Sequence, residues 1–114
     1  MMYALLIYAG TSQQQFDRLS DTEQRSIVSE FMALGEEHGV LGHGQLQPPE
    51  SSTTVRAEHG KTLTTDGPFA NTKEILGGLY LLEADNLDEA LEFASRIPTT
   101  RLGGVVEVRP MVGR

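Results

Sequence analysis

The sequence predicts a single α+β domain with an antiparallel sheet, and three observations support this prediction. Residues 2–9 and 77–84 are short runs with apolar side chains on both faces of a strand. Residues 20–38 and 86–97 carry apolar side chains at helical spacing behind a capping residue. Residues 53–65 lie between these two halves and have the threonine-rich pattern of a hairpin.

The first strand and the first helix have the clearest signals. The strand has Tyr3, Leu5 and Ile7 on one face and Ala4, Leu6 and Tyr8 on the other. Ser20 and Glu23 form a capping box, which satisfies free backbone amides at a helix start. The helical stripe that follows consists of Ile27, Val28, Phe31, Met32 and Leu34. Gly39 is suited to a left-handed stop, so we expect this helix over about residues 20–38.

The middle of the chain is poorer in apolar residues and richer in turn signals. Residues 40–46 predict a second strand, which Gly42 and Gly44 interrupt. The pair at residues 48–49 is Pro-Pro, and it ends this strand because proline cannot donate to a ladder. In the hairpin, threonine and valine favour the strands and residues 59–60, His-Gly, form the tight turn.

The last third repeats the strand–helix–strand order. After the apolar strand at residues 77–84, Asn86 and Glu89 cap a second helix, with Asp85 as an equally good cap. Its stripe consists of Leu87, Ala90, Leu91, Ala94 and Ile97, and Pro98 ends it. Residues 104–110 then form a short strand that Pro110 stops.

The order is therefore β-α-β, a hairpin, and β-α-β within one domain, residues 1–114. Without the hairpin this is the split β-α-β arrangement of a ferredoxin-like fold with an antiparallel sheet. In that fold the helices cover one face of the sheet and leave the other bare. Because two strands are apolar on both faces and the chain has no spare element, we expect a homodimer that packs sheet against sheet through a twofold interface.

Composition and motifs argue against several classes of protein. The net charge is −7, with 16 acidic and 9 basic residues, so direct binding to nucleic acid is not expected. The chain has no cysteine, which excludes disulfides, thiolate nucleophiles and cysteine-ligated zinc. It has neither a charged leader nor a run of about 18 apolar residues, so we expect a soluble, cytoplasmic protein that does not bind a membrane.

No cofactor and no metal ion are expected. The chain has no glycine-rich phosphate or dinucleotide motif. His38 and His43 lie in the segment HGVLGH, where they lack the spacing of ligands on one helical face and have no acidic cluster beside them. His59, in the hairpin turn, is expected on the surface.

The candidate site lies in LTTDGPFANTKEILGGLYLLEAD, residues 63–85. Asp66 stands at a strand end beside Gly67 and Pro68, which can hold its carboxylate toward a cleft. Burial there would raise its pKa toward acid/base work near neutral pH. The alternative is an Asx-turn, in which the carboxylate accepts from amides of its own loop. The predicted site lies beside Asp66, at the mouth between sheet and helices, and binds a small molecule.

The other candidates for this site have structural alternatives too. Phe69 either lines the pocket or plugs the core and pins the loop to the sheet. Lys73 and Glu74 either orient an anionic ligand and accept a proton, respectively, or are solvated. Thr72 either contacts the ligand or starts a helical turn. The last two candidates are Tyr8 and Tyr80, on strands that flank the cleft unless both tyrosines simply pack in the core.

Several segments resemble a known family: MYALLIYAG, LQPP, TTVR, TDGPFANTKEILGGLYLLEADNLDEALEFASRIP and VEVRP are similar to the DGPF branch of the YCII-related proteins. The resemblance covers nearly the whole chain, and its DGPF-x-x-TKE-x-x-GG-x-Y-L block is distinctive. It implies a dimeric α+β barrel built from ferredoxin-like subunits. It also implies two kinds of activity: an enzyme that uses a histidine and an aspartate, or a part in transcription initiation beside a sigma factor.

Residue by residue, the block matches at Asp66, Gly67, Pro68, Phe69, Thr72, Lys73 and Glu74. Asn71 departs from it, since an acid is usual there. The histidine of the wider group has no counterpart, because residues 20–37 contain none and His38 stands at the expected helix end. Two further hypotheses therefore stay open. The protein is either a sigma-factor accessory or sensor that binds through Glu36, Glu37, Asp88, Glu89 and Glu92, or a non-catalytic structural dimer.

Overall fold

The computed structural model describes residues 1–70 and 73–113. Four strands form an antiparallel sheet in the order β2-β5-β1-β6, and two more form a separate hairpin. The sheet strands are β1 (Met2–Tyr8), β2 (Val40–Gln45), β5 (Leu76–Glu83) and β6 (Val105–Pro110). The hairpin strands are β3 (Thr53–Glu58) and β4 (Lys61–Asp66). The helices are α1 (Ser12–Asp17), α2 (Asp21–Gly35) and α3 (Leu87–Ser95), with short 3-10 turns at η1 (Pro49–Ser51) and η2 (Pro98–Arg101).

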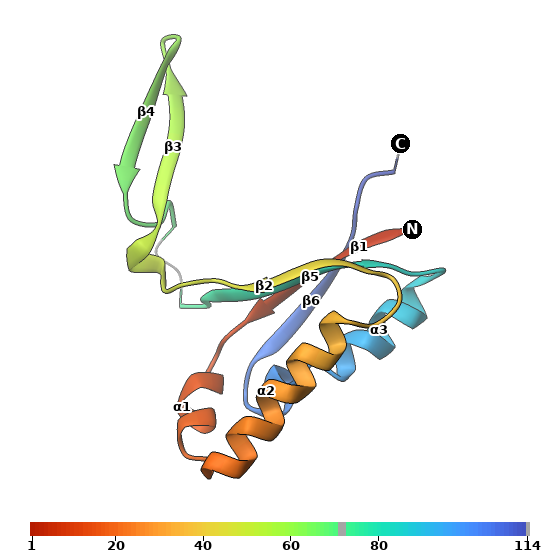
Figure 1. Cartoon of the computed structure of the whole chain (residues 1–114). Helices are drawn as coiled ribbons and strands as arrows, with labels where there is room; N and C mark the ends of the chain where they lie inside the picture. The colour runs from red at the N-terminus through yellow and green to blue at the C-terminus, as the bar shows by residue number, and fades with distance from the viewer. Residues whose placement is uncertain (71–72, 114) are drawn as a thin grey trace.

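This topology confirms the predicted ferredoxin-like α+β fold. The helices lie together on one side of the four-stranded sheet (Figure 1). Both predicted caps are present, since Ser20 and Glu23 form the reciprocal capping box and Asn86 accepts from the amide of Glu89. Helix α1 was not predicted, and it is a six-residue helix whose N-cap residue makes no side-chain cap bond.

β1 lies inside the sheet and pairs with both β5 and β6. Its residue Leu5 stands opposite Tyr80 on one neighbour and Val108 on the other, and it is completely buried. The core lies between this face of the sheet and the helices. Its buried members are Tyr3, Leu5, Ile7, Leu34, Tyr80, Leu82, Ala84, Ala90, Phe93, Ala94 and Ile97.

Both helices differ in detail from the prediction. α2 ends at Gly35, three residues before the expected end, and α3 buries Phe93, which the predicted stripe omitted. Val28 and Met32 of α2 are exposed, as are Leu87 and Leu91 of α3. Each helix contacts the sheet along a narrower stripe than the sequence suggests, because the small sheet offers little area to cover.

The second face of the sheet, here called the open face, is not covered by any helix of residues 1–70 and 73–113. Ala4, Leu6 and Tyr8 of β1 are only half-buried, as are Leu79 and Leu81 of β5. Within a single chain these strands are therefore buried on one face only, as expected for a ferredoxin-like sheet whose helices leave the other face bare. A face with this much apolar surface is a candidate for an interface.

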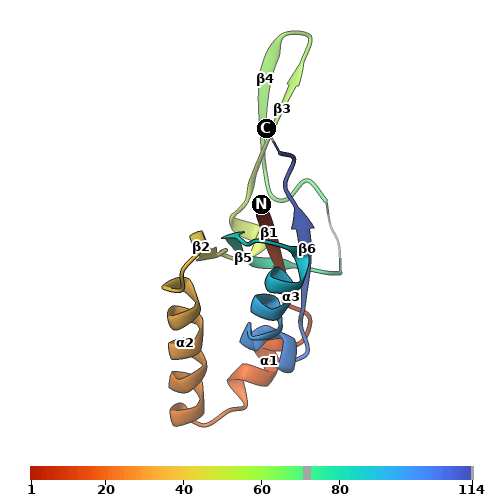
Figure 2. The same ribbon diagram turned by 90° about the vertical axis from the view of Figure 1, so that its right-hand side faces the viewer.

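The hairpin β3–β4 stands away from the body of the protein as an arm. It rises from one end of the sheet, on the side opposite the helices, and two perpendicular views agree on this direction (Figures 1 and 2). Every residue of β4 is exposed, and in β3 only Thr54 is even half-buried. His59 and Gly60 form the predicted turn, both with left-handed φ values.

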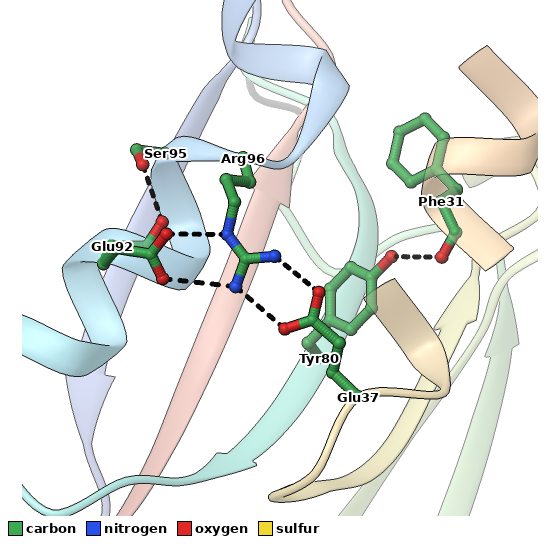
Figure 3. A network of polar contacts seen from close by, with 6 residues as sticks. All are labelled: Phe31, Glu37, Tyr80, Glu92, Ser95 and Arg96. Carbon is green, nitrogen blue, oxygen red and sulfur yellow. Dashed lines mark hydrogen bonds and ion pairs between the residues drawn. The ribbon is translucent and has the colours of Figure 1, made fainter. Parts of the chain in front are cut away.

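Arg96 joins the ends of the two long helices (Figure 3). Its guanidinium donates to both carboxylate oxygens of Glu37, at 2.5 and 2.8 Å, and pairs with Glu92 at 2.8 Å. The same guanidinium carbon lies 5.4 Å above the ring of Phe93. Chiefly through the hydrogen bond from Arg96, the pKa of Glu37 is held below its ordinary value of 4.5. Such a carboxylate stabilises the fold above its ordinary pKa, and the contribution disappears as the pH falls through the lowered value.

We expect Glu37→Gln to reduce the free energy of unfolding at pH 7 by about 0.5 kcal/mol, because the pair is partly exposed to solvent. The difference from the wild type should shrink toward zero in acid, below the lowered pKa of Glu37, where the carboxyl is protonated in both states. Urea unfolding at fixed protein concentration measures both values. The exposed neighbour provides the control variant, Glu36→Gln. An equal difference at both pH values would contradict this account of the Arg96 contact.

Candidate functional site

Asp66 is the last residue of β4 and lies at the base of the arm. Gly67 follows with φ 99, a left-handed value that glycine adopts without strain. The amide of Gly67 donates to the carbonyl of Ser52 at 2.7 Å, and its carbonyl accepts from the Thr54 hydroxyl at 2.8 Å. These bonds hold the corner from both sides. Asp66 is exposed, and no hydrogen bond between described residues ends on its carboxylate, so none supports the Asx-turn alternative.

Phe69 does not plug the core. Its side chain is 80% exposed, and the guanidinium carbon of Arg56, from β3, lies 5.7 Å from the centre of its ring. This cation–π contact attaches the loop to the arm instead of the sheet. Lys73 and Glu74 lie exposed in the segment that leads into β5. Thr72, and the departing residue Asn71, fall outside the described residues.

The two candidate tyrosines point to opposite faces of the sheet, so no single cleft contains both. Tyr8 is half-buried on the open face, whereas Tyr80 is buried against the helices. The Tyr80 hydroxyl donates to the carbonyl of Phe31 at 3.1 Å (Figure 3), and burial raises its pKa. Its ring stacks on the imidazole of His43 at 5.4 Å. Tyr80 therefore has the core role that was the alternative to a site.

His43 has a structural position as well. Its imidazole lies against the backbone of α2 at Gly35, where an added Cβ would come within 2.3 Å of the imidazole nitrogen Nε2. Any larger residue at position 35 would push this ring away from Tyr80. In residues 1–70 and 73–113, no group of three or more His, Cys, Asp or Glu side chains could hold a metal ion. No helix in the described part of the chain is long and apolar enough to cross a membrane.

The open face contains a hollow that sequence reasoning did not predict. It lies beside the C-terminal tail and has a volume of about 830 Å³. Its lining consists of Ala4, Leu6, Arg109, Pro110, Met111, Val112 and Gly113. The lining is apolar except for Arg109, whose Nε atom lies 3.6 Å from a carboxylate oxygen of Glu107. The segment VEVRP contains a sequence signal for this hollow. Strand alternation sets Glu107 and Arg109 on the face opposite Val106 and Val108, which belongs to the open face.

A smaller hollow, of about 420 Å³, lies outside the body between α1 and α2. One of its polar lining groups, the amide of Gln24, already donates to the carbonyls of Phe16 and Leu19. We therefore regard the hollow on the open face as the candidate site. The predicted location, at the mouth between sheet and helices, is wrong, because the arm and Asp66 stand on the other side of the sheet (Figure 1).

Comparison with known proteins agrees with this fold. Residues 1–112 match the model of the YCII-related domain. A relative from Rhizobium meliloti (strain 1021), "Uncharacterized protein R00369", is 37% identical over 97% of this chain and 92% of its own length. The solved structure of 5-chloro-2-hydroxyhydroquinone dehydrochlorinase (TftG) from Burkholderia phenoliruptrix AC1100, in complex with 2,5-dihydroxybenzoquinone, is similar in fold. It has a TM-score of 0.52 and 17% identity, with 98% of this chain and 94% of that chain covered.

The family match extends over nearly the whole chain, and the relative from Rhizobium meliloti exceeds 30% identity over most of both proteins. The topology described above agrees with both. The chain belongs to the YCII-related family.

Proposed function

We propose that this protein binds a small molecule in the hollow on the open face, as a homodimer whose second copy covers that face. The observation that carries the proposal is the lining of the hollow, which is apolar apart from the cationic side chain of Arg109. Ligand sites typically combine apolar walls with a few polar groups that fix orientation. In this proposal Arg109 anchors the ligand, and Asp66 serves as the acid or base.

The exposed area supports a second copy. The chain exposes 8218 Å², whereas a compact monomer of this mass exposes roughly 6,200 Å². The surplus of about 2,000 Å² per chain is large enough for an obligate homodimer, which buries about 2,000 Å² or more in total. A second copy can cover the apolar strip on this face by packing its own equivalent strip against it. The strip consists of Ala4, Leu6, Tyr8, Leu79 and Leu81.

The chemistry of the hollow suits a flat, oxygen-bearing ring. Apolar side chains of Ala4, Leu6 and Met111 can contact the face of a ring, while a guanidinium donates to oxygens at its edge. TftG, which has a similar fold, is described in complex with 2,5-dihydroxybenzoquinone, a ligand of this shape. Hydroquinone is an uncharged member of the same class and therefore a suitable probe.

The alternative partner surface on the helices has less free charge than the sequence implies. Glu37 and Glu92 are paired with Arg96, and Glu89 accepts from the amide of Asp85. That leaves Glu36 and Asp88 of the five acidic residues considered. No contact among the described residues favours the sigma-factor hypothesis over the hollow.

We expect Arg109→Gln to weaken the binding of hydroquinone at least about tenfold, because hydrogen bonds to a charged group contribute about 1.5–3 kcal/mol. Isothermal titration calorimetry at pH 7 measures this. A matched control is Arg18→Gln, since Arg18 is an exposed arginine at the end of α1, away from the hollow. Equal weakening in both variants, or no binding of hydroquinone to the wild type, would contradict the proposed site.

A further inference from the structure

Among the described residues, the arm β3–β4 contacts its own chain only near its base and at Phe69. Almost all of its residues are exposed, and its strands make their main contacts with each other. The radius of gyration is 16.1 Å, compared with roughly 13 Å for a compact chain of this length. An isolated two-stranded hairpin is at best marginally stable in water. A well-formed arm of six residue pairs therefore needs a surface to lie against.

We propose that the arm of one copy closes the hollow of the other, so that each site is built from two chains. Asp66 would come from one chain and Arg109 from its partner copy. This inference rests on the proposed homodimer and adds to it a defined position for the arm. It also accounts for the distance between the two features in one chain, because the arm and the C-terminal tail rise from opposite ends of the sheet (Figure 1).

Twofold symmetry brings these two ends together. An axis that runs across the strands, midway between two facing sheets, exchanges the two ends of the sheet. The arm of the second copy then descends beside the C-terminal tail of the first, where the hollow lies. The exchange is reciprocal, so both arms and both hollows find a partner in a single closed dimer.

The length of the arm fits this arrangement. Facing sheets pack about 10 Å apart, and a strand rises about 3.3 Å per residue. Asp66 and Thr53 form the pair at the base of the arm, level with their own sheet. Two residues further along, Val55 and Thr64 stand about 7 Å above that base, and the next pair on the same face, Ala57 and Thr62, about 13 Å above it, so these two pairs bracket the level of the partner copy's sheet. The apolar side chain of Val55, which is 64% exposed, then meets the tail, where Val112 is 96% exposed.

The two faces of the arm carry different side chains, and this difference indicates which face contacts the hollow. One face carries the charged residues Arg56, Glu58 and Lys61, and Phe69 lies against Arg56 on that face. On the other face, apart from Asp66, the side chains are small and uncharged: Thr53, Val55, Ala57, Thr62 and Thr64. This second face suits an apolar hollow. Its one carboxylate is complementary in charge to Arg109, whose contact with Glu107 is long.

A cross-linking experiment tests the exchange without any ligand. Because the chain has no native cysteine, only the introduced cysteines can form a disulfide. We expect the double variant Val55→Cys/Val112→Cys to oxidise to a covalent dimer, because the two side chains meet only between copies. The control pair is Leu63→Cys/Val112→Cys, since Leu63 lies on the opposite face of the arm. It should cross-link at least about tenfold more slowly, because a disulfide requires Cβ atoms within about 4.5 Å. Equal rates for the two pairs, or no cross-link in a protein that sediments as a dimer, would overturn the arm exchange.

A mixing experiment tests whether the site is composite. We expect Asp66→Asn and Arg109→Gln each to weaken hydroquinone binding about tenfold as homodimers. When the two variants are co-expressed, half of the dimers are mixed, and one hollow in each mixed dimer combines the intact Arg109 with the intact Asp66. About a quarter of all hollows should then bind with wild-type affinity. If Asp66 and Arg109 served the same hollow from one chain, no hollow would recover.

These outcomes separate the two proposals. Loss of binding in both single variants without recovery on mixing would overturn the exchange and leave the proposed function standing. A fast cross-link through Val55 and Val112, together with unchanged hydroquinone binding in Arg109→Gln, would overturn the proposed function and leave the exchange standing.

Discussion

The structure depends on the burial of one strand that is apolar on both faces. β1 lies in the interior of the sheet, and its residues Tyr3, Leu5 and Ile7 pack beneath the helices. The alternate residues Ala4, Leu6 and Tyr8 face the other way and are only half-buried by their own chain. Each buried CH₂ contributes about 0.8 kcal/mol, so leaving this second face in water forfeits substantial free energy. The proposed second copy would supply that cover and would account for the open face, the arm and the hollow together.

The two faces of the sheet differ in how their polar side chains are paired. On the helix side, Tyr80 is held by the Phe31 carbonyl, by His43 and by Phe93, and the Arg96 contacts join the helices above it. Among the described residues, no buried side-chain nitrogen or oxygen lacks a hydrogen-bond partner, which is the arrangement of a satisfied core. On the open face, by contrast, Arg109 has one long contact with Glu107 and lines an apolar hollow. Arg109 beside the apolar hollow is therefore a better candidate for ligand binding than the cluster beneath the helices.

Local sequence signals predicted most of the fold correctly. Both helix caps, the His59-Gly60 turn and the position of every sheet strand follow from neighbouring residues, because capping and turn formation are local interactions. The signals failed where tertiary packing decides. Phe93 is buried and Leu91 exposed because of how α3 lies on the sheet, and Phe69 is attached to Arg56 on the arm. Tyr8 and Tyr80 looked like equivalent candidates until the register showed them on opposite faces. The lining of the hollow combines Ala4 and Leu6 of β1 with residues 109–113, which lie more than 100 residues further along the chain.

The claim most central to this account is that a second copy covers the open face of the sheet. Sedimentation equilibrium over a range of protein concentrations measures the subunit number directly. The account predicts a single species of about 25 kDa, twice the 12.5 kDa of one chain, that persists on dilution to low micromolar concentration. A well-folded species with the mass of one chain at every concentration would contradict it.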